Sequence, residues 1–214
     1  MGLAFHSLVL GPFATNAYWV WCEDTRETAI IDVGFDPRRI ADLVREAGLV
    51  VRYLLNTHAH YDHVAAMAEL QELVGGSYWL HSGDRFLLDS LTEQGAMFDL
   101  PPAAPPETVN DLADGQILPL GNASLTAIHT PGHSPGSVTF RWERCLWVGD
   151  VLFAGSIGRT DLPGGSSEDL AASIRERLFP LGDDFRVLPG HGPETTLGAE
   201  RRSNPFVGEG ATQA

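Results

Sequence analysis

The chain of 214 residues contains no lysine, and all 14 of its basic residues are arginine. Chemistry that depends on a lysine amine, such as a Schiff base or the phosphate-binding lysine of a P-loop, is therefore excluded. Acidic residues are in excess, and the net charge is −14 at pH 7. Nucleic-acid-binding proteins carry basic faces, and anionic membranes attract basic segments, so neither nucleic acid nor a membrane is expected as a partner.

Cysteine and long apolar runs are also scarce. The two cysteines, Cys22 and Cys145, form no C-x-x-C pair, and both lie in apolar, strand-like segments. We expect them to be small buried hydrophobic side chains. No apolar run approaches the roughly 20 residues that span a bilayer. The N-terminus lacks the basic segment of a secretory signal, and these features predict a cytoplasmic protein.

The remaining pattern alternates between strand-like and helix-like segments. Helices are predicted over residues 36–47, 64–74, 84–94 and 168–178. Strands are predicted over residues 5–10, 18–22, 29–33, 50–56, 77–81, 117–120, 124–129, 137–142, 145–149 and 185–188. Two mixed halves, with strands inside and helices outside, predict a layered α/β sandwich.

The densest chemical signal is the heptapeptide Thr57-His58-Ala59-His60-Tyr61-Asp62-His63. Imidazole and carboxylate are the usual ligands of zinc and of non-haem iron. The heptapeptide directly follows a predicted strand and precedes a predicted helix, which is where α/β proteins place their sites. A solvated polar loop would not be expected to combine three histidines and an aspartate within so few residues.

Three more candidate ligands follow predicted strands, each directly after a glycine. They are His133, Asp150 and His191. Glycine lets the backbone turn sharply, which can bring such side chains onto a shared rim. Together with the heptapeptide they make five histidines and two aspartates, enough to hold two metal ions with one carboxylate between them.

The candidate ligands lie on both sides of the proline-rich segment 101–106, which we expect to be a stiff connector and not a domain boundary. The two halves must then share one site. We therefore predict a single domain over residues 1–207. The small, polar segment 208–214 is expected to be a flexible C-terminal tail.

These motifs resemble those of metallo-β-lactamase-fold hydrolases, in particular the glyoxalase II (hydroxyacylglutathione hydrolase) group. The resemblance rests on His58-x-His60-x-Asp62-His63, on His133, Asp150 and His191, and on the stretch 149–159. It covers the chain from about residue 8 to about residue 206. It implies a four-layer αββα sandwich with the site at one edge of the two sheets.

The resemblance also implies a role for each ligand. His58, His60 and His133 would hold the first metal, and Asp62, His63 and His191 the second, with Asp150 bridging both. Zinc is the expected metal, while iron and manganese also suit a site of histidine and aspartate.

The implied reaction is hydrolysis of a small-molecule thioester such as S-lactoylglutathione. Two cations roughly 3.5–4 Å apart lower the pKa of a bridging water toward about 7, which provides a hydroxide that attacks the carbonyl. The first metal would take up the developing oxyanion charge, and the second would stabilise the thiolate, which ionises readily. Asp150 would hold the two metals together and Asp62 would orient the hydroxide.

The chain departs from the glyoxalase II pattern around the substrate. A basic residue of that group binds the glycine carboxylate of glutathione, and Arg159 stands at its position. Asp161 and Pro193 stand where the group has tyrosine, and only about 15 residues follow Glu200, so the helical C-terminal extension is missing. The chain is thus similar to the short glyoxalase II-like bacterial proteins, with Arg159 as the candidate substrate-binding residue.

Other activities of the same fold are alternatives to thioester hydrolysis. A persulfide dioxygenase resembles the chain at Gly158-Arg159-Thr160-Asp161 and uses a single iron, but its usual continuation differs from residues 162–165. A lactone or ester hydrolase is a further alternative. A true β-lactamase is disfavoured because those enzymes are exported and lack the bridging aspartate. Ser134 formally fits G-x-S-x-G, but a strand follows it where a nucleophile elbow needs a helix.

Overall fold

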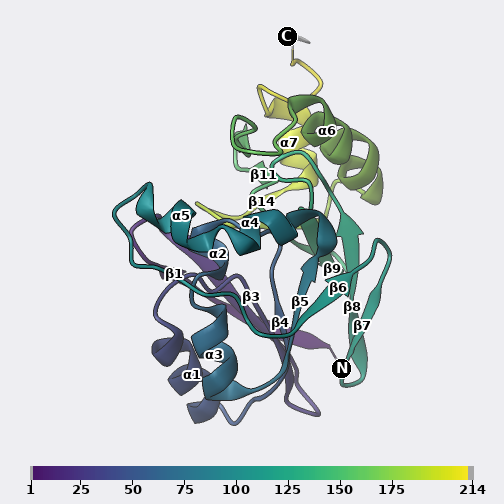
Figure 1. Ribbon diagram of the computed structural model, residues 1–214. Helices are drawn as coiled ribbons and strands as arrows, with labels where there is room; N and C mark the ends of the chain where they lie inside the picture. Colours follow the sequence, from purple (N-terminus) through teal and green to yellow (C-terminus); the bar gives the residue numbers. More distant parts are fainter. Residues whose placement is uncertain (1, 212–214) are drawn as a thin grey trace.

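Two six-stranded β-sheets pack face to face, and helices cover the outer side of each sheet (Figure 1). The computed structural model describes residues 2–211 of the chain. The predicted α/β fold, a four-layer αββα sandwich, is therefore confirmed. The layers matter here because the candidate ligands all follow strands that end at one edge of the sandwich.

The first sheet is formed by the N-terminal half of the chain. Its strands β1, β2 and β3 are antiparallel, and β3, β4, β5 and β6 run parallel to one another. In order across the sheet they are β1 (Leu3–Leu10), β2 (Thr15–Cys22), β3 (Glu27–Ile31), β4 (Val50–Leu55), β5 (Ser77–His81) and β6 (Val109–Leu112).

The second sheet is formed by the C-terminal half. Strands β7 to β10 are antiparallel neighbours, and β13 adds to β10 in parallel. The order is β14 (Thr195–Thr196), β13 (Arg186–Pro189), β10 (Cys145–Gly149), β9 (Val138–Trp142), β8 (Ala123–His129) and β7 (Ile117–Leu120). A small hairpin of β11 (Leu152–Phe153) and β12 (Ser156–Ile157) lies outside both sheets.

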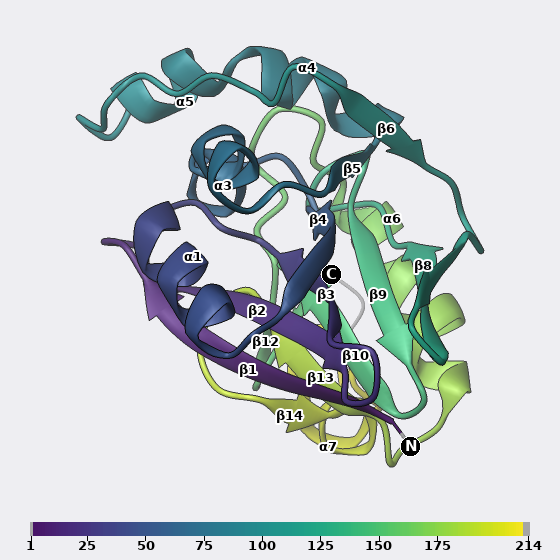
Figure 2. The ribbon, with the colours of Figure 1, turned by 90° about the horizontal axis from the view of Figure 1, so that it is seen from below.

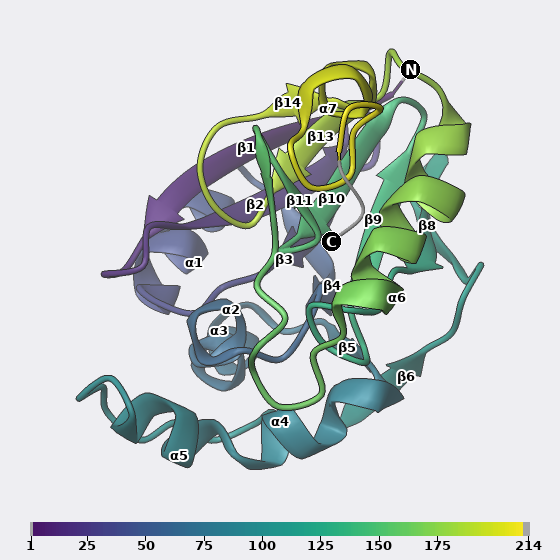
Figure 3. The same ribbon diagram turned by 90° about the horizontal axis from the view of Figure 1, so that it is seen from above.

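The α-helices fall into four groups. Helices α1 (Pro37–Glu46) and α3 (Met67–Val74) lie outside the first sheet, while α6 (Ser167–Ala172) and α7 (Leu197–Ser203) lie outside the second (Figures 2 and 3). The short α2 (Tyr61–Val64) carries part of the heptapeptide. Helices α4 (Arg85–Asp89) and α5 (Leu91–Ala96) run along one end of the sandwich, away from the sheet faces (Figure 3).

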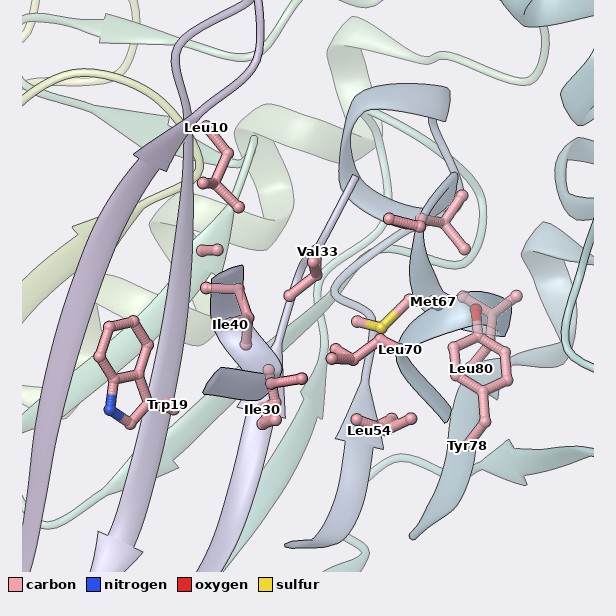
Figure 4. Packing of buried hydrophobic residues seen from close by; sticks show 14 of the residues in the cluster. Leu10, Trp19, Ile30, Val33, Ile40, Leu54, Met67, Leu70, Tyr78 and Leu80 are labelled. Atoms are coloured by element: carbon pink, nitrogen blue, oxygen red, sulfur yellow. The ribbon is translucent and has the colours of Figure 1, made fainter. Parts of the chain in front are cut away.

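Alternation along the strands separates the hydrophobic cores. In β2, Trp19 packs under the helices of the first sheet while Val20 packs between the sheets. In β10, Trp147 faces the space between the sheets while Leu146 packs under the helices of the second sheet. Figure 4 shows the first core, with Met67 and other side chains of α1 and α3 meeting β2 to β5. The period of two explains why the sequence pattern identified these strands.

The end of the described chain is held in place. Gly208 is buried, and its N–H donates to the carbonyl of Asn204 at 2.9 Å. The predicted flexible tail 208–214 falls partly on residues 212–214, which lie outside the described residues. Among residues 2–211 no helix is both long enough and apolar enough to cross a bilayer.

Candidate metal centre

The structure brings all seven predicted ligands together at one edge of the sandwich. They come from the turn after β4, from α2, and from the turns that follow β8, β10 and β13. Their side chains form three overlapping groups whose ligand atoms lie within 4.8 Å of one another. The groups are His58, His60 and His133; His58, His63 and Asp150; and Asp62, His63 and His191.

The first group is a cluster of three buried imidazoles. The Nδ1 atom of His60 lies 2.8 Å from Nε2 of His133, which in turn lies 3.2 Å from Nε2 of His58. Three ring nitrogens therefore point at one place. This convergence suits a cation with tetrahedral nitrogen and oxygen ligands.

The group of Asp62, His63 and His191 is more open to the cavity beside it. Nε2 of His191 lies 3.2 Å from Oδ2 of Asp62, and Nε2 of His63 lies 3.5 Å from the same oxygen. The hydroxyl of Thr15 donates to that oxygen at 2.8 Å, which fixes the carboxylate of Asp62. His191 and Asp62 are the more exposed members, with 28% and 17% of their side chains accessible.

Asp150 lies between the two groups. Its Oδ1 is 3.4 Å from Nε2 of His63, and its Oδ2 is 3.7 Å from Nε2 of His133 and 3.5 Å from Nε2 of His191. Oδ1 is buried and has no hydrogen-bond partner among the described residues. A buried carboxylate oxygen without a donor is costly, and a cation would compensate for it.

The outward-facing ring nitrogens of four of the five histidines lie against oxygen atoms. Nε2 of the fifth, His60, is buried and has no hydrogen-bond partner among the described residues. Nδ1 of His133 donates to the carbonyl of Arg159 at 2.8 Å, and Nδ1 of His191 donates to the carbonyl of Phe13 at 3.1 Å. Nδ1 of His63 lies 3.0 Å from a carboxylate oxygen of Asp32. With the proton on Nδ1, the neutral ring of each of these histidines would present the lone pair of Nε2 to the centre, as metal-binding histidines require.

Asp32 organises this hydrogen bonding from beneath. One oxygen accepts from the hydroxyl of Thr57 at 2.7 Å, and the other accepts from the backbone N–H of Thr57 at 2.8 Å. The Thr57 hydroxyl oxygen lies 3.0 Å from Nδ1 of His58, so it can accept the proton of that ring. Asp32 thus contacts His63 directly, and it contacts His58 indirectly, through the hydroxyl of Thr57. Sequence analysis missed it, because a single aspartate after a strand carries no pattern.

Asp84 joins the two loops that carry the first ligand group. Its carboxylate accepts from the N–H of Ala59 at 3.0 Å, from the hydroxyl of Ser134 at 2.7 Å and from the N–H of Gly136 at 2.6 Å. The side chain is fully buried, and burial raises its pKa against the effect of these donors. Asp84 was predicted only as the start of a helix, so this link was also missed.

Two of the glycines before the ligands are required for different reasons. Gly149 has a φ of +53°, which favours glycine, and a Cβ there would collide with Thr57. Gly190 is not among the glycines with positive φ, but a Cβ there would collide with Asp150 and His63. The positive φ of Gly149 agrees with the sharp turn expected there. Gly190 is required for another reason, which is that the backbone passes close to two of the ligands.

The pKa shifts in the cluster favour neutral rings at His58 and His60 and ionised carboxylates, while the pKa of His63 is shifted upward. Burial holds the pKa of His58 well below its usual value and, with neighbouring histidines, lowers that of His60 to about 3. Burial opposes ionisation of Asp62 and Asp150, yet the surrounding histidines lower the pKa of both carboxyls. These carboxylates raise the pKa of His63 in spite of its burial, so a cation must displace a proton there.

Arg159, the candidate substrate-binding residue, is placed at the rim of the site. Its Nε and Nη2 atoms donate to the two carboxylate oxygens of Asp161 at 2.7 and 2.8 Å. The arginine side chain is 57% exposed. Its backbone carbonyl accepts a hydrogen bond from the candidate ligand His133, whereas its side chain is paired with Asp161 at the surface.

A cavity of about 760 Å³ opens onto the metal centre. His60, Asp62, His133, Asp150 and His191 line its floor. Tyr61 also lines it, but its hydroxyl donates to the carbonyl of Pro101 at 2.7 Å. Ser134 is buried and does not line the cavity, in agreement with its rejection as a nucleophile.

Comparison with known proteins shows the family to which the chain is related. The family model for the metallo-beta-lactamase superfamily matches residues 10–191. Hydroxyacylglutathione hydrolase GloC of Haemophilus influenzae is 41% identical over 201 residues, which cover 91% of this chain and 93% of that protein.

Two solved structures are similar over nearly their whole length. The BLEG-1 B3 metallo-beta-lactamase superposes with a TM-score of 0.87 at 37% identity, covering 95% of this chain and 99% of that one. TTHA1623, crystallised in a di-iron-bound form, gives a TM-score of 0.85 at 39% identity, covering 94% and 99%.

Proposed function

The chain belongs to the metallo-beta-lactamase superfamily, and we propose that this metallohydrolase cleaves a small thioester of the S-lactoylglutathione type. The observation that carries the proposal is the position of Asp150 between two three-residue ligand groups. The similarity to a hydroxyacylglutathione hydrolase supports the choice of a thioester. A glutathione thioester as substrate also supports a cytoplasmic location.

The residues present fit two divalent cations. His58, His60 and His133 would hold one ion, Asp62, His63 and His191 would hold the other, and Asp150 would contact both. When bound, such ions supply a hydroxide nucleophile at neutral pH and a Lewis acid for the carbonyl. Zinc is favoured by the nitrogen-rich ligand set, and the di-iron form of TTHA1623 makes iron a second candidate.

The side chains of the site have separate tasks in this proposal. Asp62, fixed by Thr15, faces the cavity and would orient the attacking hydroxide through its free oxygen. No acidic side chain is needed at the leaving group, because a thiol ionises readily and its thiolate is a good leaving group. Tyr61 would not serve as an acid, since its hydroxyl is committed to Pro101.

A second candidate activity is hydrolysis of a β-lactam. The aspartate at the bridging position and the export of true β-lactamases disfavour it. A structure described as a B3 metallo-beta-lactamase nevertheless matches 95% of this chain at 37% identity. We therefore include a β-lactam among the substrates to be tested.

The decisive experiment measures metal content and three activities on the same purified protein. We expect close to two metal ions per chain and hydrolysis of S-lactoylglutathione. Oxygen uptake on glutathione persulfide by protein that holds a single iron would contradict the proposal and favour the dioxygenase. Turnover of nitrocefin without turnover of the thioester would favour the β-lactamase.

A further inference from the structure

The cavity beside the metal centre has apolar walls. We use the name apolar wall for the six large apolar side chains of Phe13, Phe86, Met97, Phe98, Phe153 and Leu162, which line this cavity. Its members come from the loop between β1 and β2, from α4, from the turn after α5, from β11, and from the loop before α6. Segments far apart in the chain thus place hydrocarbon around one opening.

Much of this wall is open to solvent in the free protein. Phe13 and Phe98 both line the cavity and pack edge to face, with ring centroids 5.2 Å apart. Even so, Phe98 is 51% exposed, Phe86 is 46% exposed and Met97 is 73% exposed. A group of exposed large apolar side chains around a concavity marks a binding surface.

The charges at the mouth do not suit an anionic carrier. Apart from the candidate ligands, Glu93 and Arg159 are the charged residues among the described residues that line the cavity. Arg159 is already paired with Asp161 through two hydrogen bonds. Glutathione has two carboxylates, and the cavity offers them a single guanidinium whose charge is largely balanced.

We infer that the enzyme selects thioesters by an apolar acyl group, of the size of a hexyl or phenyl group, that lies against the apolar wall. This inference rests on the proposed thioester hydrolysis and names its substrate class. In it, the acyl group provides most of the selectivity and the thiol carrier provides little. Lactoyl, which is small and hydroxylated, would be a poor acyl group.

The first test measures binding without turnover, on the metal-loaded enzyme. S-methylglutathione and S-hexylglutathione are thioethers that cannot be hydrolysed, and they differ only in the hydrocarbon that stands in place of the acyl group. Each methylene that leaves water favours binding by roughly fourfold at full burial. We expect calorimetry to give a Kd for the hexyl ligand that is at least about tenfold lower. Equal values would overturn the inference.

Matched variants locate the effect. Phe98→Ala and Phe86→Ala should each reduce the ratio of the two Kd values by at least about threefold. Phe206→Ala is the control, because Phe206 is 54% exposed, much like Phe98, and does not line the cavity. If both variants kept the full preference for the hexyl ligand, the hexyl group would bind somewhere other than the apolar wall, and the inference would be overturned.

Turnover separates this inference from the proposed function. S-mandeloylglutathione carries a phenyl group where S-lactoylglutathione has a methyl group, and we expect its kcat/KM to be about tenfold higher. Turnover of both with the lactoyl substrate preferred would overturn the inference alone. Turnover of neither would overturn the thioester proposal, while the Kd ratio still decides between an apolar wall that binds hydrocarbon and one that does not.

Discussion

The floor and the mouth of the cavity are built by opposite means. On the floor, the outward nitrogens of four histidines are held by Asp32, Thr57 and two backbone carbonyls, so the ligand geometry is over-determined by hydrogen bonds. At the mouth, apolar side chains such as those of Phe86 and Phe98 are about half exposed to solvent. In the proposed function, the hydrogen-bonded floor would carry the reaction and the apolar mouth would select the substrate.

Two residues belong to both regions. The carbonyl of Phe13 accepts from His191 while its ring packs against Phe98, and the carbonyl of Arg159 accepts from His133 while its side chain lies at the rim. Their side chains can therefore be changed without removing the floor contact. This separation makes the comparison testable by substitution.

The largest effect is expected from Asp150→Ala, which removes the carboxylate between the two ligand groups. Removal of a residue that only hydrogen-bonds to a metal ligand typically lowers metal affinity or activity 10- to 100-fold. Loss of Asp150 itself should lower kcat/KM by more than about a hundredfold. Elemental analysis should show fewer metal ions per chain than in the wild type. Full activity of the variant with undiminished metal content would show that Asp150 is not part of the metal centre.

Asp84→Asn should have the next largest effect. An amide cannot accept from all three donors, so the loops of Ala59 and Ser134 would lose part of their link. We expect metal affinity or activity to fall by roughly 10- to 100-fold, measured by chelator competition and by kcat. Asp111→Asn is the control, since that carboxylate lies on the surface in an ion pair with Arg85. Equal effects of the two substitutions would show that Asp84 has no part in the metal site.

The floor was predictable to the extent that its ligands form a pattern. Three histidines and an aspartate in one heptapeptide, and three glycine-preceded residues at strand ends, are visible without coordinates. Asp32 and Asp84 are not, because each is one of 28 acidic residues and acts through the backbone of distant segments. Their role depends on tertiary contacts that no local spacing encodes.

The fold was predicted where one face of an element is apolar. The strand expected over 145–149 coincides with β10, whose side chains alternate between two cores. Strand β6 was missed, because it is short and follows the proline-rich segment. The helix predicted over 84–94 is divided at Ser90, whose φ and ψ of −102° and 20° end α4. The mouth was not predicted either, since its aromatic residues have no regular spacing.

A smaller effect is expected at the rim. Arg159→Ala should raise the KM for S-lactoylglutathione by less than about fivefold with little change in kcat, because an exposed ion contact contributes about 0.2–1 kcal/mol. Asp161→Asn should have the opposite sign, lowering KM by about twofold, since it frees the guanidinium. Steady-state kinetics of both variants checks this. A collapse of kcat in Arg159→Ala would mean that the guanidinium acts on the reacting atoms.

The smallest effect on turnover is expected from Ser134→Ala. Ser134 is the central residue of the G-x-S-x-G match, so a serine-nucleophile hypothesis predicts complete loss of activity. In the structure its hydroxyl is buried and donates to Asp84 at 2.7 Å, and Ser137 lies 2.8 Å away as a neighbouring hydroxyl. Asp84 would keep its two backbone donors in the variant.

We therefore expect kcat to stay within about threefold of the wild type. The free energy of unfolding should fall by about 1–2 kcal/mol, the net contribution of one hydrogen bond to a buried acceptor. Urea denaturation and steady-state kinetics on one preparation measure both quantities. A large loss of kcat at full metal content would contradict the division proposed here, because a residue behind the floor would then take part in the reaction.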